Sequence, residues 1–336
     1  MDFKKLITRY RQFGGIRLVR EYAKLGALWP AVKAGVRCMV KGQSFKGIYP
    51  EVLKRVEPVL VAKYGHIVQE FKELNVQGHT DTTDIAEDAS TSSATIWWCW
   101  LQGFEAAPPI VKACYNSLVR DEWFTAHGYE VKVIDNSNWR EYVELPGYIV
   151  EKWEKGRIPA ALFSDLLRLE LLIKYGGTWI DATVLCTGFA SPETLEALSY
   201  LNADLFVFQY TPKGTVTGIS ISNWFISACS NNEILLTLRD MLRAYWRDFD
   251  CTVDYYIFHL FFELIAREYP DKIVAMPYGS SIKSITLMHH LGDRFDLEKW
   301  NRFTSRICFH KLAYNVSEAI KQDKGNYYSE ILRRYE

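Results

Sequence analysis

The sequence predicts a mixed α/β fold in which helices flank a mainly parallel sheet. Short β-prone runs alternate with helix-like stretches from residue 95 to about residue 268, an alternation typical of parallel sheets with crossover helices. A strongly apolar helix also ends in a Gly-Gly turn that leads directly into a strand, KYGGTWIDATV at 174–184. The chain of 336 residues is long enough for one large domain with an appendage, or for two domains.

Residues 1–75 are expected to form a basic helical extension. Apolar side chains recur at helical spacing within residues 3–25, where Gly14 and Gly15 interrupt the pattern. Residues 1–50 hold eleven Lys and Arg residues against two acidic residues, a net charge of +9 in a chain whose net charge is zero. A basic amphipathic helix of this kind can lie on an anionic membrane surface. A helix that packs on the main domain and leaves its basic face in water stays open as the alternative.

A polar linker is expected at residues 76–94, which are rich in Thr, Ser, Asp and Ala, and a single domain is expected at 95–336. Pro159 suits the first turn of a helix over 157–177, and Gly176 suits its C-terminal cap. The expected strands lie at 94–101, 128–135, 178–185, 205–210 and 221–228, and the other expected helices lie at 108–120, 231–247 and 252–268.

The cysteines and the apolar runs of the sequence indicate the cellular compartment in which the protein is expected. The seven cysteines are widely spaced and include no CxxC pair, so neither a zinc knuckle nor a disulfide framework is indicated, and a reducing cytosol fits best. The N-terminal stretch MDFKKLITRYRQFGG lacks the apolar core of a secretory signal, and no apolar run approaches the ~18 residues of a membrane span. We therefore expect a cytoplasmic protein, with peripheral attachment to the inner face of the plasma membrane left open.

Polar residues around the Gly-Gly turn are the candidates for a site. Ser164 and Asp165 stand four and three residues before Arg168 on an otherwise apolar helix, so these side chains share one face. The acid and the guanidinium either pair with each other or line a polar cleft that holds a ligand's hydroxyls and phosphates. Asp181 lies at the end of the next strand, where ligands bind in open α/β sheets, and Thr183 is expected to point to the same side.

The stretch SDLLRLELLIKYGGTWIDATV resembles the signature of glycosyltransferases with the GT-A fold, in particular the family 32 sugar-transferase group, with S-D-x-x-R on a helix, then Y-G-G and a strand ending in D-x-D. Within that group the chain looks most like the bacterial capsular polysaccharide synthesis proteins. The segments IWWCWLQGFEAAPPIV at 96–111, SNWFISA at 222–228 and FHKLAYN at 309–315 resemble other parts of the same domain, so the likeness runs over about residues 95–315. It implies a GT-A-type, mainly parallel, Rossmann-like sheet.

The resemblance also implies a nucleotide-sugar site. Trp100 would stack on the base, Asp165 and Arg168 would contact the donor sugar and diphosphate, and Lys311 would reach the diphosphate. The other donor-binding residues implied are Gln102, Ser164, Asp181, Thr183 and Asn223. Asp181 and His310 would hold a divalent cation, Mn²⁺ or Mg²⁺, although Thr183 stands where related proteins have the second acid of D-x-D, and a hydroxyl is a weaker ligand than a carboxylate.

The function implied is transfer of a sugar, with retention, from a nucleotide-sugar donor to a growing capsular or exopolysaccharide, on a saccharide or lipid-linked acceptor. Asp181, Arg168 and Asp254 are the expected catalytic residues, and Asp254 and Asn223 are the candidates for the acceptor side. Cationic groups are needed because the departing diphosphate carries negative charge. Two alternatives stay open, a sugar-phosphate transferase of capsule synthesis and a non-catalytic nucleotide-sugar-binding assembly protein. Nucleic acid is not an expected partner, and His259 is expected to be a core or interface histidine.

Overall fold

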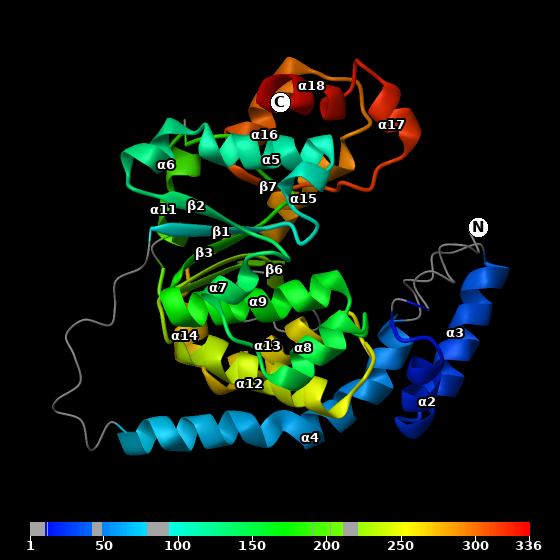
Figure 1. Cartoon of the computed structure of the whole chain (residues 1–336). Coiled ribbons are helices and arrows are strands. Elements are labelled where there is room, and N and C mark those ends of the chain that lie inside the picture. The colour runs from blue at the N-terminus through cyan, green and yellow to red at the C-terminus, as the bar shows by residue number, and fades with distance from the viewer. Residues whose placement is uncertain are drawn as a thin grey trace. The chain divides into compact units, whose positions relative to one another are not determined.

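The computed structural model describes residues 11, 13–41, 49–78, 94–189, 191–201, 203–210 and 221–336 of the chain (Figure 1). The chain divides into two compact units, each assembled from three stretches. The first, which we call the helical unit, comprises Met1–Ala86, Glu144–Leu169 and Glu233–Pro270. The second, which we call the sheet unit, comprises Glu87–Val143, Glu170–Asn232 and Asp271–Glu336. The domain and linker boundaries predicted from the sequence, 1–75, 76–94 and 95–336, stay predictions.

The described residues of the sheet unit form a five-stranded sheet in the order β2-β1-β3-β6-β5. Its strands are β1 (Thr95–Cys99), β2 (Glu130–Ile134), β3 (Gly177–Asp181), β5 (Leu205–Gln209) and β6 (Ile221–Ala228). Strands β2, β1 and β3 are parallel, whereas β6 runs antiparallel to both of its neighbours, β3 and β5. All the strands except β6 therefore share one direction, which confirms the predicted α/β fold with a mainly parallel sheet.

The expectation of one strand at 178–185 is wrong. Strand β3 ends at Asp181, a turn follows at Ala182 and Thr183, and a separate strand β4 (Val184–Cys186) begins. Strand β4 pairs antiparallel with β7 (Phe309–Lys311) in a second, two-stranded sheet. Because its partner lies more than 120 residues further along the chain, no local pattern indicates where β3 gives way to β4.

Helices of the sheet unit pack on its strands (Figure 1). Helix α5 (Pro109–Val119) packs against β4 and against α18 (Tyr327–Tyr335), while α15 (Ser281–His289) packs against β5 and β7. One core layer crosses three strands in register, with Trp98 beside Ile180 and Ile180 beside Phe225, and all three side chains are buried. The remaining helices are α6 (Glu122–Ala126), α7 (Trp139–Tyr142), α10 (Pro192–Leu195), α11 (Leu198–Leu201), α14 (Pro270–Ala275), α16 (Leu297–Thr304) and α17 (Glu318–Gln322), with a 3₁₀ turn η2 (Phe104–Ala106).

Helix α9 (Ala160–Tyr175) is the strong helix expected from the sequence, and Gly176 ends it as predicted. Gly176 has a φ of +67°, in the left-handed region that favours glycine. A Cβ at this position would lie 3.0 Å from the Ser230 backbone nitrogen and 3.2 Å from the Ala228 carbonyl oxygen. The glycine therefore allows the chain to turn tightly beside β6 and enter β3.

The helical unit contains α2 (Ile16–Lys24), α3 (Leu28–Val40), α4 (Tyr49–Gly78), α8 (Gly147–Glu154), α12 (Glu233–Asp248) and α13 (Ile257–Glu268). The long helix α4 packs against α3, α12 and α13 (Figure 1). It does so through a stripe spaced four residues apart, Val52, Val56, Leu60, Tyr64 and Val68, all of which are buried. The expected helical extension is confirmed where it is described. The part of the predicted amphipathic helix at residues 3–10 and most of the predicted linker, 79–93, lie outside the described residues.

The helix expected at 252–268 begins later, at Ile257. The Tyr245 hydroxyl donates to the Cys251 carbonyl oxygen at 2.7 Å and accepts from the Val253 backbone N–H at 2.9 Å. These two bonds hold the preceding segment out of the helix. Across the described part of the chain, no helix combines the length and the apolar character that crossing a bilayer requires.

Candidate functional site

Trp100, Asp181 and Lys311 of the sheet unit lie at the edge where the parallel strands end. Asp181 is the last residue of β3, and Cys99 of β1 is its partner in the sheet. Trp100 follows Cys99 directly, and its backbone N–H donates to the Ile134 carbonyl oxygen of β2 at 3.0 Å. The structure therefore brings Trp100 and Asp181 to the same edge, where open α/β sheets bind their ligands.

Lys311 contacts the Asp181 carboxylate directly. Its Nζ lies 2.6 Å from Asp181 Oδ2, and the Trp179 indole N–H donates to Asp181 Oδ1 at 2.8 Å. Lys311 reaches this position from β7, where it pairs with Val184 of β4. About a fifth of each charged side chain is exposed, 21% for Lys311 and 23% for Asp181. The pair is thus a cation and an anion held at the rim of the sheet, open to a ligand.

Trp100 directly follows Cys99, the sheet partner of Asp181, and it forms an aromatic pair with Tyr314, which lies three residues after Lys311. The rings of Trp100 and Tyr314 meet edge to face, with centroids 5.3 Å apart and planes at 87°. Tyr314 keeps about half of its surface exposed. Sequence reasoning singled out Trp100 but missed Tyr314, although it lies within the segment FHKLAYN at 309–315. Such faces suit stacking with a base or a sugar.

Two more polar residues lie at this edge. Phe225 of β6 pairs with Ile180, so Asn223, two residues nearer the start of β6, reaches the edge at which β3 ends. Asp135 directly follows β2, and its Oδ1 accepts from the Ser137 backbone N–H at 2.7 Å. The sequence showed Asp135 at the end of an expected strand, yet it was not named as a candidate. Gln102 lies exposed in the turn after Trp100.

The predicted metal ligands do not converge in this arrangement. Successive residues of a strand point to opposite faces, so His310 does not face Asp181 as Lys311 does. His310 is buried, its Nε2 lies 3.3 Å from Thr187 Oγ1, and burial lowers the pKa of its imidazole to about 4. Thr183 is also buried, and its carbonyl oxygen accepts from the Leu312 N–H at 2.8 Å.

The donor set therefore does not fit a divalent cation well. The Asp181 carboxylate is already engaged by an ammonium group, and Thr183 offers a hydroxyl where a carboxylate would be needed. Within the ranges that the structure describes, no group of three or more His, Cys, Asp and Glu side chains is placed to hold a metal ion. A cation held by Asp181 and His310 stays a prediction that these contacts do not favour.

The helical unit holds the remaining predicted residues. Arg168 Nη2 lies 3.2 Å from Asp165 Oδ1, and both side chains are buried. The Arg168 guanidinium also donates to the hydroxyl and carbonyl oxygens of Ser164, each at 3.3 Å. Asp165 and Arg168 thus pair with each other, one of the two arrangements that their spacing left open.

Asp254 is a buried carboxyl group in the same unit. Its Oδ1 accepts from the Tyr256 backbone N–H at 2.7 Å, while Oδ2 has no hydrogen-bond partner among the described residues. Burial raises the pKa of this carboxyl to about 6, against the opposing effect of the Tyr256 N–H. A buried group with a pKa near neutrality and an open oxygen is a candidate proton acceptor.

His259 and Phe258 lie close to Arg168, which sequence reasoning did not foresee. The Arg168 guanidinium carbon lies 5.9 Å from the centre of the Phe258 ring. Burial, together with the positive charge of Arg168, lowers the pKa of His259 to about 3. His259 is therefore neutral near pH 7. Asp165, Arg168 and Asp254 belong to the helical unit and Trp100 and Asp181 to the sheet unit, so their convergence on one cleft stays a prediction.

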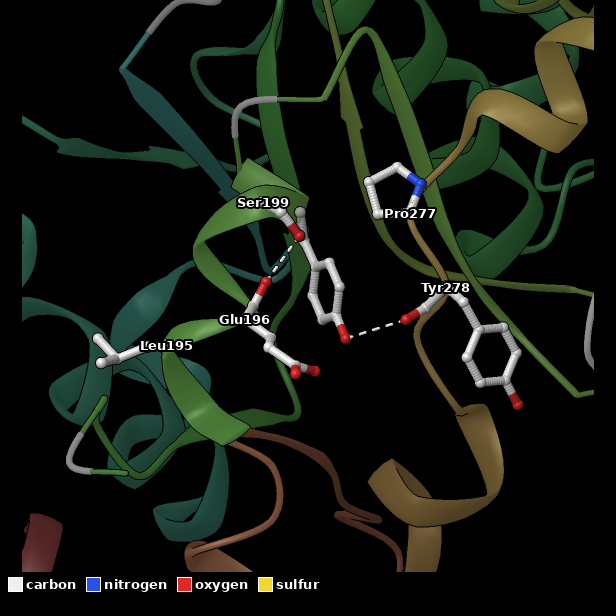
Figure 2. A pocket seen from close by; sticks show the side chains of 6 residues that line it. Leu195, Glu196, Ser199, Pro277 and Tyr278 are labelled. Atoms are coloured by element: carbon white, nitrogen blue, oxygen red, sulfur yellow. Dashed lines mark hydrogen bonds between the residues drawn. The ribbon is translucent and has the colours of Figure 1, made fainter. Parts of the chain in front are cut away.

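Figure 2 shows a separate hollow in the sheet unit, of about 340 Å³, which none of the predicted site residues line. It is lined by Leu195, Glu196, Ser199, Tyr200, Pro277 and Tyr278. The Tyr200 hydroxyl donates to the Tyr278 carbonyl oxygen at 3.2 Å, and its ring stacks on Phe206 of the edge strand β5 at 4.1 Å. The hollow thus lies along the outer side of β5, at the far end of the strand order from β2.

Fold and site together define an α/β protein with charged and aromatic side chains at the carboxyl edge of a mainly parallel sheet. The model of the family described as capsular polysaccharide synthesis protein matches residues 41–331, and the chain belongs to that family. Among solved structures, the chain is similar to one titled PaToxG glycosyltransferase, with 13% identity and a TM-score of 0.37 over 81% of this chain and 96% of that chain. That likeness is too slight to bear on function. No curated protein matches the chain.

Proposed function

We propose that this protein is a glycosyltransferase that moves a sugar from a nucleotide-sugar donor to a growing capsular or exopolysaccharide, with retention at the anomeric carbon. One observation carries the proposal: the Lys311–Asp181 pair lies beside Trp100 at the carboxyl edge of the sheet. The pair offers charge to a diphosphate and the indole offers a face to a base. Membership of the capsular polysaccharide synthesis family agrees with a saccharide product.

Lys311 is given the role of stabilising the leaving group. In the transfer, an acceptor hydroxyl oxygen forms a bond to the anomeric carbon while the bond from that carbon to the diphosphate oxygen breaks. The electron pair of the broken bond leaves with the nucleoside diphosphate, and the hydroxyl proton passes to a base. A fixed ammonium group within reach of the departing oxygen lowers the energy of the developing charge. Asp181 fixes the ammonium group in position through the 2.6 Å contact.

Asp181 has a second role in the proposal. When a diphosphate takes over the Lys311 ammonium group, the carboxylate can accept hydrogen bonds from ribose or sugar hydroxyls. The Trp179 N–H, at 2.8 Å, keeps the carboxylate oriented during this exchange. Divalent cations supply charge neutralisation in many phosphate sites. The contact of Lys311 with Asp181 supports giving that part to the chain's own ammonium group in this proposal.

Two buried residues of the helical unit are given roles in the proposal. Asp254 is the proposed base, because its pKa of about 6 lets it accept a proton near neutral pH. Arg168, oriented by Asp165 and Ser164, is proposed to contact the donor sugar and diphosphate. The acceptor class proposed is a saccharide, free or linked to a lipid.

The proposal is tested by incubating the purified chain with UDP-, GDP- and CDP-sugars and measuring free nucleotide. We expect release from at least one donor, and loss of about a hundredfold or more in turnover for Asp181→Asn, which keeps the side-chain shape and removes its charge. Product analysis by NMR should show a new glycosidic bond whose anomeric configuration matches that of the donor. A phosphodiester product would instead identify a sugar-phosphate transferase, and binding of donors without any turnover would identify an assembly protein.

A further inference from the structure

Helix α3 presents an apolar face to solvent. Trp29, Val32, Val36 and Val40 follow one another at spacings of three and four residues, so they form one stripe along the helix. All four are exposed, Trp29 by 72% and Val40 by 82%, and Met39 beside them is exposed as well. Single exposed apolar residues are common on soluble proteins, whereas a contiguous stripe marks an interaction surface.

The opposite face of α3 accounts for its packing. Ala34 and Cys38 are buried there, and the helix packs against α2 and α4. Small side chains on this face let α3 approach its neighbours closely, while the larger side chains point away from them. Among the described residues, the stripe therefore lies on the side of α3 that faces away from α2 and α4.

The charged residues around the stripe indicate the kind of surface that it can bind. Residues 16–41 hold six Lys and Arg residues and one acid, Glu21, which Lys24 engages at 2.7 Å. Lys33, Arg37 and Lys41 recur every four residues along one flank of the stripe, and α3 itself contains no acidic residue. Glu51 of α4 lies 3.7 Å from the Arg37 guanidinium, so Lys33 and Lys41 are the two flanking cations that the argument uses. Apolar side chains bordered by basic ones suit the surface of a lipid bilayer, where anionic headgroups cover apolar acyl chains.

We propose that α3 docks this protein on an anionic lipid surface, with the helix in the plane of the interface and the stripe among the lipid headgroups and upper acyl chains. Trp29 suits the level of the headgroups, where indole rings concentrate. Lys33 and Lys41 then contact lipid phosphates from the flank. This inference goes beyond the proposed function and does not depend on it, since vesicle binding needs neither donor nor acceptor.

The test is sedimentation of the full chain with vesicles of phosphatidylcholine, with and without phosphatidylglycerol. We expect binding that requires the anionic lipid and weakens at high salt, because exposed charges are screened. The double substitution Val36→Asp and Val40→Asp should weaken binding at least tenfold. Lys33→Glu and Lys41→Glu should each weaken it at least about fivefold, the fold-change that corresponds to about 1 kcal/mol per basic residue near such a surface.

Ile282→Asp is the matched control, since Ile282 is an exposed aliphatic residue on α15 of the sheet unit. It should bind vesicles as the unchanged chain does. Circular dichroism should give equal helix content for all variants. Absence of vesicle binding, or equal binding by the Val36/Val40 variant, would overturn the proposal. Self-association that the same variant abolishes, without vesicle binding, would assign the stripe to a second copy of the chain instead.

Discussion

Replacing Lys311 by methionine should separate catalysis from stability. The change removes the ammonium group 2.6 Å from Asp181 but keeps the length of the side chain. Each charged side chain is about four-fifths buried, and Asp181 keeps the Trp179 N–H as a partner, so loss of the ion pair should lower the free energy of unfolding by about 1–3 kcal/mol. Removing one preorganised electrostatic contact to a developing charge typically costs about 10² to 10³ in turnover. We therefore expect at least a hundredfold loss of nucleotide release from a chain that stays folded, with only a modest fall in the midpoint of urea unfolding.

Lys152→Met is the matched control because Lys152 also forms a close ion pair, with Nζ 3.0 Å from Asp250 Oδ1. Its side chain is only 11% exposed and also donates to the Phe249 carbonyl oxygen at 3.0 Å. Loss of these contacts should lower the free energy of unfolding by about 1–3 kcal/mol and leave turnover of the folded protein within about twofold. Should Lys311→Met keep wild-type turnover, or should Lys152→Met lose as much, the role given to Lys311 would be wrong.

Three further outcomes are expected. Asp254→Asn should abolish transfer yet stabilise the folded protein above pH 6 by up to about 3 kcal/mol. The pKa of Asp254 is about 6 in the folded protein and 3.8 ordinarily, so the wild type loses stability as the pH rises from about 4 to 6. Urea unfolding of both proteins at about pH 3 and about pH 8 measures the difference. EDTA should leave nucleotide release within about twofold, because Lys311 supplies the charge; a larger loss that Mn²⁺ restores would reinstate the cation predicted with Asp181. Gly176→Ala should lower the free energy of unfolding by about 1–3 kcal/mol, since its Cβ would crowd backbone atoms at a positive φ, and an unchanged unfolding midpoint would refute this.

Features that depend on neighbours in the sequence could be predicted. The apolar period of α9, its glycine cap and the strand that follows are local, and Gly176 adopts the positive φ that its place predicted. The spacing of three residues also placed Asp165 and Arg168 on one face of the helix, but it left open whether they pair, and the structure shows that they do. Because the sheet was predicted to be mainly parallel, Asp181 at the carboxyl end of β3 could be predicted to lie at the edge where such sheets bind ligands.

Contacts between distant segments could not be predicted from spacing. Strand β7 lies more than 120 residues after β4, so neither their pairing nor the break between β3 and β4 leaves a local signal. The same separation hides the contact of Lys311 with Asp181 and that of Tyr314 with Trp100. Family resemblance named Lys311 as a residue near the diphosphate, but only the register of β7 shows that Lys311, and not His310, faces Asp181.

The central claim is that a nucleoside diphosphate binds at the carboxyl edge of the sheet, against Trp100 and Lys311. A crystal structure of the chain with the nucleoside diphosphate released in the donor assay tests it most directly. The base should lie against the rings of Trp100 and Tyr314, and a phosphate oxygen should lie within about 3.2 Å of Lys311 Nζ in place of the Asp181 carboxylate. A nucleotide bound elsewhere, with the Lys311–Asp181 contact intact, would contradict it.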